Sequence, residues 1–199
     1  MIAPFILFIF WGGLPLKIFT FILSAFGMYE FYKALKEKDF KPIEMVGYIL
    51  LILFYLFNND FEKLIFMIIL ATFILLIIPV IDLKYTFIDA AITLLGFLYV
   101  GILFSFIYLV SEKSGGAFYV WLIFIGSWMT DTTAYYAGRL FGKTKLCPKV
   151  SPKKTIEGSI GGLIGSTISC GILGFVAKGY IATFPIYHFF IIGALCGVF

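Results

Sequence analysis

Long apolar segments, separated by short polar connections, run through the whole of this 199-residue chain. A helix needs about 20 apolar residues to cross the hydrocarbon layer of a bilayer. Unbroken apolar runs of this length exclude a β-barrel. The segments lie at about residues 2–12, 14–35, 44–57, 61–81, 85–110, 117–138, 156–177 and 184–199. The sequence therefore predicts an all-α fold, a polytopic integral membrane helical bundle with about seven or eight transmembrane segments.

The composition supports the same class of protein. Hydrophobic residues make up 62% of the chain and charged residues only 13%, whereas about a quarter of a soluble domain is charged. The basic residues flank apolar segments and form no soluble basic face, so we expect no nucleic acid as a partner. We expect one membrane domain, 1–199, with an N-terminal helical scaffold, 1–116, and core helices, 117–199, that include a basic loop at 139–155.

The distribution of Lys and Arg predicts the orientation. If the first segment enters from the cytoplasm, the connections at 33–43, 82–84 and 139–155 are cytoplasmic and hold eleven of the 15 cationic residues. Cytoplasmic loops of membrane proteins carry an excess of Lys and Arg. We therefore expect a protein of the cell (inner) membrane whose active site faces the cytoplasm, where nucleotides are.

An acidic residue within an apolar segment, Asp131, is the first candidate for chemistry. It precedes Gly138 by seven residues, and so lies about 10 Å deep at 1.5 Å per residue. An ionised carboxylate in the hydrocarbon layer is costly unless it faces a bundle interior, a water-filled cavity or a cation. Glu30 and Asp89 lie near the same membrane face, where interfacial solubility explains them. We therefore assign a functional role to Asp131 and not to these two acids.

A basic loop follows Asp131 and ends at the start of the next helix. Its cations are Arg139, Lys143, Lys145, Lys149, Lys153 and Lys154. Ser151 or Thr155 is expected to cap that helix, with Pro152 in its first turn. A helix start binds anions through its free N–H groups and its dipole, and lysines there add full charges. A carboxylate that holds a cation, together with these lysines, suits a polyphosphate–metal complex.

Small residues recur at four-residue spacing in the segment that follows this loop. Such spacing allows two helices to approach closely. We therefore predict a packing role for Gly162 and Gly165. Gly158 is the exception, because it sits where a ligand can approach the helix start.

Two runs of this sequence resemble a known family. The runs are Asp131–Pro148, DTTAYYAGRLFGKTKLCP, and Ser151–Gly162, SPKKTIEGSIGG. Both are similar to the core of the phosphatidate cytidylyltransferase (CDP-diacylglycerol synthase) family, and the specific part of the likeness covers roughly 128–162. The family's second signature, near its C-terminus, has no match here. We therefore expect this chain to be a fragment with little or no activity by itself.

The resemblance implies a nucleotidyltransferase of phospholipid biosynthesis. The reaction would convert CTP and phosphatidic acid into CDP-diacylglycerol and pyrophosphate at the lipid bilayer. Mg²⁺ would be the cofactor, with a second metal ion left open. A homodimer is also left open.

The resemblance also implies roles for individual residues. Asp131 would hold the metal or its bound water, Lys153 and Lys154 would hold phosphates, and Glu157 would orient a lysine or the metal shell. Substrate would further be bound by Ser151, Thr155, Gly158, Arg139 and Lys143. For Arg139 and Lys143 the competing interpretation is a charge at the membrane surface beside anionic lipid.

Three alternatives to the cytidylyltransferase stay open at this point. A CTP-dependent polyprenol kinase of similar architecture would transfer the terminal phosphate and release CDP. A membrane transporter or channel would also contain intramembrane acids and broken helices. An inactive fragment would have only a scaffold role.

Overall fold

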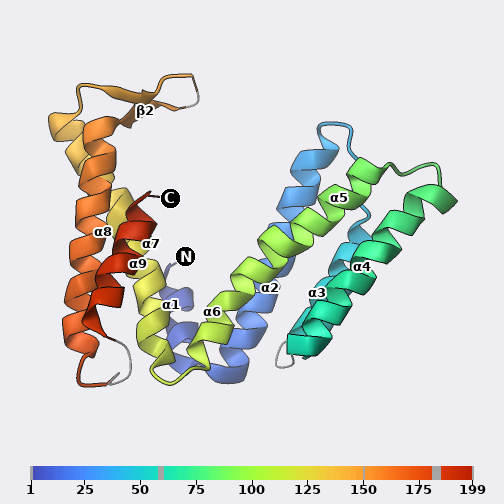
Figure 1. The fold of residues 1–199 in the computed structure, drawn as a ribbon, viewed down its shortest axis with the longest axis horizontal. Helices are drawn as coiled ribbons and strands as arrows, with labels where there is room; N and C mark the ends of the chain where they lie inside the picture. The colour runs from blue at the N-terminus through green and yellow to red at the C-terminus, as the bar shows by residue number, and fades with distance from the viewer. Residues whose placement is uncertain (1, 58–60, 150, 181–184, 199) are drawn as a thin grey trace. The chain divides into compact units, whose positions relative to one another are not determined.

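The computed structural model describes residues 2–57, 61–149, 151–180 and 185–198 (Figure 1). In its described residues each predicted apolar segment is mainly helical, and the prediction of an all-α fold is confirmed. The elements, in chain order, are α1 (Ile2–Trp11), α2 (Gly13–Lys36), α3 (Glu44–Phe57), α4 (Phe61–Ile81), α5 (Phe87–Leu95), the π-helix η1 (Gly96–Ile102), α6 (Leu103–Ser111), α7 (Gly116–Phe141), β1 (Lys145–Cys147), β2 (Ser151–Thr155), α8 (Ile156–Ala177) and α9 (Ile186–Val198).

The described helices have the lengths and compositions of a membrane protein. The helices α3 and α9 are apolar but shorter than a full span. The helix α7 has 26 residues, but its second half carries polar side chains such as Asp131 and Arg139. Four described stretches are long and apolar enough to cross a membrane, namely Gly13–Lys36, Glu62–Ile81, Phe87–Ser111 and Ile156–Ala177.

The chain forms two compact units, residues 1–112 and 113–199, with the boundary between α6 and α7. In the first unit, α2 packs against η1 and α6, and α3 packs against α4 and η1. Tyr32 is fully buried there, and its hydroxyl donates a hydrogen bond of 2.9 Å to the Thr93 carbonyl oxygen. A Cβ atom at Gly96 would lie 2.8 Å from Cζ of Tyr32. The glycine at the start of η1 therefore makes room for this ring.

A capping box starts α5 in the first unit. The Asp89 carboxylate accepts hydrogen bonds from the Thr86 N–H at 2.8 Å and from the Lys41 N–H at 2.6 Å. Asp89 is only 4% exposed. The interpretation that Asp89 is a solvent-exposed charge at the membrane interface is therefore wrong. Its carboxylate satisfies free backbone donors and joins the connection before α3 to the start of α5.

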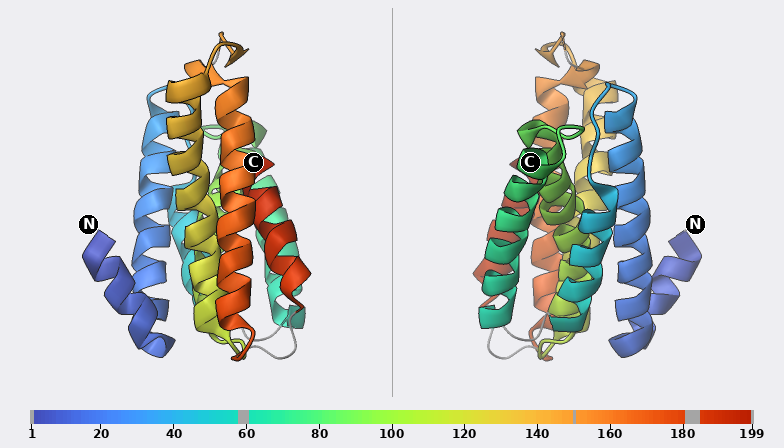
Figure 2. Two further views of the ribbon diagram at one scale, coloured as in Figure 1. Left: turned by 90° about the vertical axis from the view of Figure 1, so that its left-hand side faces the viewer. Right: turned by 90° about the vertical axis from the view of Figure 1, so that its right-hand side faces the viewer.

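The second unit is built from α7, α8 and α9 (Figure 2, left). The helices α7 and α8 pack along small residues, as the sequence predicted. A Cβ atom at Gly162 would lie 3.2 Å from the Ala134 Cβ, and one at Gly165 would collide with the Thr133 side chain. One turn after Gly162, the buried Ser166 hydroxyl donates a hydrogen bond of 2.8 Å to the Gly193 carbonyl oxygen of α9. The packing role of Gly162 and Gly165 is confirmed.

Candidate functional site

A short β-hairpin joins α7 to α8 and carries half of the cationic side chains of the second unit. The strands β1 and β2 are antiparallel, with Lys145 opposite Thr155 and Cys147 opposite Ser151. Figure 1 shows β2 leading directly into α8. The sequence predicted a basic loop here. The structure shows that backbone hydrogen bonds between β1 and β2 order part of this loop. The hairpin places the lysines at the end of the unit where α7 ends and α8 begins.

Thr155 connects the hairpin to both helices. Its Oγ1 accepts a hydrogen bond of 3.1 Å from the Gly158 N–H, so Thr155 is the N-cap of α8, as one of the two predictions had it. A Cβ atom at Gly142 would lie 2.9 Å from Oγ1 of Thr155, and one at Gly138 would lie equally close. The side chain is buried against the end of α7. One residue therefore caps α8 and fixes the hairpin on α7.

Ser151 and Pro152 do not have the local roles that the sequence suggested. Both lie in β2, before the helix. The prediction that Ser151 caps α8 and that Pro152 occupies its first turn is wrong. The physical reason is that the backbone from Ser151 to Thr155 pairs with β1, and α8 begins only at Ile156.

Glu157 closes the base of the hairpin. Both of its carboxylate oxygens lie 3.2 Å from the Thr144 N–H, and the Thr144 carbonyl oxygen accepts a hydrogen bond of 3.0 Å from the Ile156 N–H. The carboxylate also lies in the first turn of α8, where the helix dipole favours negative charge. The structure therefore places Glu157 as a support of the hairpin. Sequence reasoning missed Thr144, since no local pattern marks it.

Lys153 and Lys154 are exposed consecutive residues of β2. Lys145 pairs with Thr155 and Cys147 with Ser151, so three residues of β2, 152–154, lie opposite the single residue Leu146, and the strand is irregular at both lysines. Among the described residues, neither lysine has an ion-pair partner. Their charges are therefore available to a ligand.

Asp131 lies on α7 and is exposed. Seven residues make two helical turns, so Asp131 lies in line with Gly138, the residue that contacts Thr155. The carboxylate stands about 10 Å along the helix from the level of that contact. In the described part of the chain it has no hydrogen-bond or ion-pair partner. The structure thus places an unpaired acid below the base of the hairpin, on the same stripe of α7.

The remaining predicted site residues lie around this arrangement. Arg139 is exposed in the last turn of α7 and its Nη1 donates a hydrogen bond of 3.4 Å to the Tyr135 hydroxyl. Lys143 is exposed just after α7. Gly158 is buried, its N–H bonds to Thr155, and a Cβ atom on it would lie 2.9 Å from the Ala134 carbonyl oxygen. The approach of a ligand to Gly158 stays a prediction, while its packing on α7 is directly visible.

The donor set decides what kind of metal site these residues can form. No cluster of three or more His, Cys, Asp or Glu side chains occurs among the described residues. Mg²⁺ usually keeps several waters and is held by one or two carboxylates plus substrate phosphates. The exposed Asp131 fits this mode of binding, in which the ion arrives with a nucleotide. It does not form an all-protein cage.

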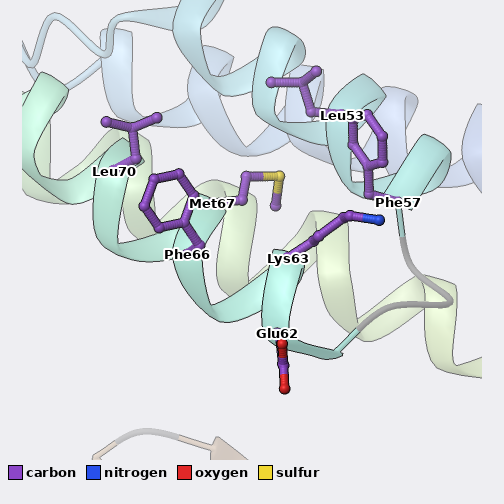
Figure 3. Close-up of a pocket in the computed structure, with 7 residues that line it drawn as sticks. All are labelled: Leu53, Phe57, Glu62, Lys63, Phe66, Met67 and Leu70. Atoms are coloured by element: carbon purple, nitrogen blue, oxygen red, sulfur yellow. The ribbon is translucent and has the colours of Figure 1, made fainter.

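An apolar groove in the first unit is a different kind of feature. It has a volume of about 400 Å³ and lies between α3 and the start of α4. Figure 3 shows Leu53 and Phe57 on one side and Phe66, Met67 and Leu70 on the other. The Glu62 carboxylate points away from these rings in the same view. A groove lined in this way suits hydrocarbon chains and offers little to a triphosphate.

Comparison with known proteins assigns the chain. The family model described as the cytidylyltransferase family matches residues 1–199. The chain belongs to the cytidylyltransferase family. It is 38% identical to a phosphatidate cytidylyltransferase of Staphylococcus saprophyticus, over 79% of this chain and 62% of the relative. It is 37% identical to that of Staphylococcus haemolyticus, with the same coverage. Over 85 residues it is 48% identical to that of Staphylococcus aureus, which covers 43% of this chain and 32% of the relative.

The family assignment confirms the resemblance that the sequence indicated over 128–162. The chain spans about three fifths of the length of the curated relatives it matches, since it covers 62% of each of the first two. Together with the apolar helices, the family identifies an integral membrane protein.

Proposed function

We propose that the full protein transfers a cytidylyl group from CTP to phosphatidic acid and releases pyrophosphate. The observation that carries this proposal is that the acid Asp131 and the hairpin lysines Lys153 and Lys154 form no ion pair among the described residues and lie toward the same end of the unit. Opposite charges that do not neutralise each other within the protein are suited to a ligand that carries both signs. A nucleoside triphosphate with its bound Mg²⁺ is such a ligand. The names of the relatives support the choice of CTP and phosphatidic acid.

The proposed reaction needs no nucleophilic side chain of the protein. The phosphate of the lipid is itself a nucleophile, so catalysis consists of positioning and charge stabilisation. Mg²⁺, when bound, would neutralise phosphate oxygens and polarise the phosphorus that is attacked. Asp131 would hold that ion or its water.

The hairpin would supply the positive charges for the phosphates. We assign Lys153 and Lys154 to phosphates, because both are exposed and neither forms an ion pair among the described residues. Glu157 and Thr155 would act by positioning, because they hold the hairpin on α8 and α7. Ser151, Arg139 and Lys143 remain proposed substrate contacts at the rim of this arrangement.

The reaction is tested with the natural full chain reconstituted in vesicles that contain phosphatidic acid. We expect release of pyrophosphate that requires both CTP and the lipid. Release of CDP in place of pyrophosphate would instead identify a kinase. Ion flux without consumption of CTP would identify a transporter.

We also propose that the hairpin faces the cytoplasm and that the protein resides in the cell membrane. The excess of cations on the connections supports this orientation. Cys147 is exposed in β1, whereas Cys170 is buried in α8. A membrane-impermeant maleimide should therefore label Cys147 in inside-out vesicles and not in intact cells, and the Cys147→Ser variant should lose the label. Labelling in intact cells would contradict the orientation. A homodimer stays a prediction, tested by the mass of the protein in mild detergent.

A further inference from the structure

A cavity of about 480 Å³ lies in the first unit, between the end of α2, the start of α3 and the connection from α4 to α5. Its lining includes Lys36, Lys41, Lys84, Glu44, Phe40 and Met45. We call this cavity the lysine pocket. All of its residues belong to the first unit, and none belongs to the candidate site on α7, the hairpin and α8.

The lysine pocket has an excess of positive charge. The Lys36 Nζ lies 2.9 Å from a carboxylate oxygen of Glu44, so these two charges neutralise each other. Lys41 and Lys84 are exposed, and within the described residues neither forms an ion pair. Among the described residues, two cationic side chains therefore line the cavity outside ion-pair distance of a carboxylate, while Lys41 also attracts the buried Asp89 carboxylate. Such a pair attracts a phosphate group.

Buried polar groups hold the two walls of the pocket together. The Asp89 carboxylate accepts hydrogen bonds from the Lys41 N–H on one wall and from the Thr86 N–H beside Lys84 on the other. The Ile43 N–H donates a further bond of 2.7 Å to the buried Thr93 hydroxyl. The backbone positions of the two unpaired lysines are thus fixed before any ligand arrives. Preorganisation of this kind lowers the entropic cost of binding.

The surroundings of the pocket indicate where its ligand comes from. The pocket lies where the candidate span Gly13–Lys36 ends and the candidate span Phe87–Ser111 begins. The ends of membrane spans lie at the level of the lipid headgroups. Phe40 and Met45 add apolar surface beside the lysines. Basic pockets between membrane helices at the cytoplasmic side bind anionic lipid headgroups.

We propose that the lysine pocket binds the phosphate headgroup of an anionic membrane lipid, at a site separate from the one proposed for cytidylyl transfer. Lys41 and Lys84 contact the phosphate, and Phe40 and Met45 contact the adjoining apolar part of the lipid. The inference does not depend on the proposed reaction, because it uses none of the residues assigned to that reaction.

The test uses the natural full chain in nanodiscs of phosphatidylcholine with a small share of a photoactivatable phosphatidylglycerol. After irradiation and chymotryptic digestion, we expect labelled peptides from 36–45 and from 83–87. The double variant Lys41→Gln/Lys84→Gln should reduce this labelling by at least about tenfold, since each of these lysines would donate a charge-assisted hydrogen bond to the phosphate. The matched control is Lys33→Gln/Lys38→Gln, which removes two exposed charges of the same region that do not line the pocket. It should keep labelling within about twofold.

Four results would overturn the proposal. Equal loss in the control variant would mean that only general surface charge attracts the probe. Equal labelling by a photoactivatable phosphatidylcholine, whose phosphate is balanced by a cationic group, would mean that the net negative charge of the lipid is not recognised. Displacement of the lipid probe by millimolar inorganic phosphate would assign the pocket to a soluble phosphate instead. Unchanged labelling in Lys41→Gln/Lys84→Gln would remove these lysines from the site.

Discussion

The cap at Thr155 allows a direct test of how the hairpin is held. The variant Thr155→Val keeps the branched shape that contacts Gly138 and Gly142 but removes the oxygen that accepts the bond of 3.1 Å from the Gly158 N–H. Its extended backbone, with φ −123° and ψ 154°, accommodates valine. Loss of an N-cap costs about 1 kcal/mol. That corresponds to about a fivefold change in the equilibrium for local opening.

Hydrogen exchange followed by mass spectrometry measures this opening. In Thr155→Val, amides of the first turn of α8, residues 156–159, should exchange about fivefold faster, while amides of α9 should be unchanged. Turnover should fall as well, because the hairpin that carries the lysines is held less firmly. Thr155→Ser is the matched control, since it keeps the accepting oxygen and removes only the methyl group. Unchanged exchange in the valine variant, or equal acceleration in both variants, would refute the assignment of Thr155 as the cap that fixes the hairpin.

Three further predictions concern the same unit. Asp131→Asn in the full protein should abolish CTP-dependent release of pyrophosphate, while the temperature of unfolding in detergent should stay unchanged. Normal turnover in this variant would reject the metal-binding role of Asp131. Lys153→Ala and Lys154→Ala should each lower turnover at least about tenfold. Normal turnover in both variants would reject their assignment to phosphates. Gly165→Val should destabilise the protein by about 1–3 kcal/mol through overpacking against Thr133. Thermal unfolding measures this loss, and Ile164→Val, a substitution at an exposed neighbour, is the control. A Gly165→Val variant as stable as the unsubstituted protein would contradict the packing between α7 and α8.

The sequence determined the helical segments and the chemical character of the candidate site. Apolar runs long enough to cross a bilayer predict helices without any knowledge of tertiary contacts, because the backbone must satisfy its own hydrogen bonds in hydrocarbon. The acid of α7, the run of lysines and the small residues of α8 could likewise be found directly. The packing role of Gly162 follows from its spacing alone.

Only the tertiary structure decided which residues hold these parts in place. Asp89 bonds to Lys41, and Glu157 to Thr144, across gaps in the sequence that no periodicity describes. Ser151 is not the cap of α8, because the backbone from Ser151 to Thr155 pairs with β1. Hydrophobicity and helix signals are local properties, whereas such pairings depend on register and on backbone donors that become neighbours only after folding. The positions of the lysines relative to Asp131, and of Lys41 relative to Lys84, are consequences of those long-range bonds.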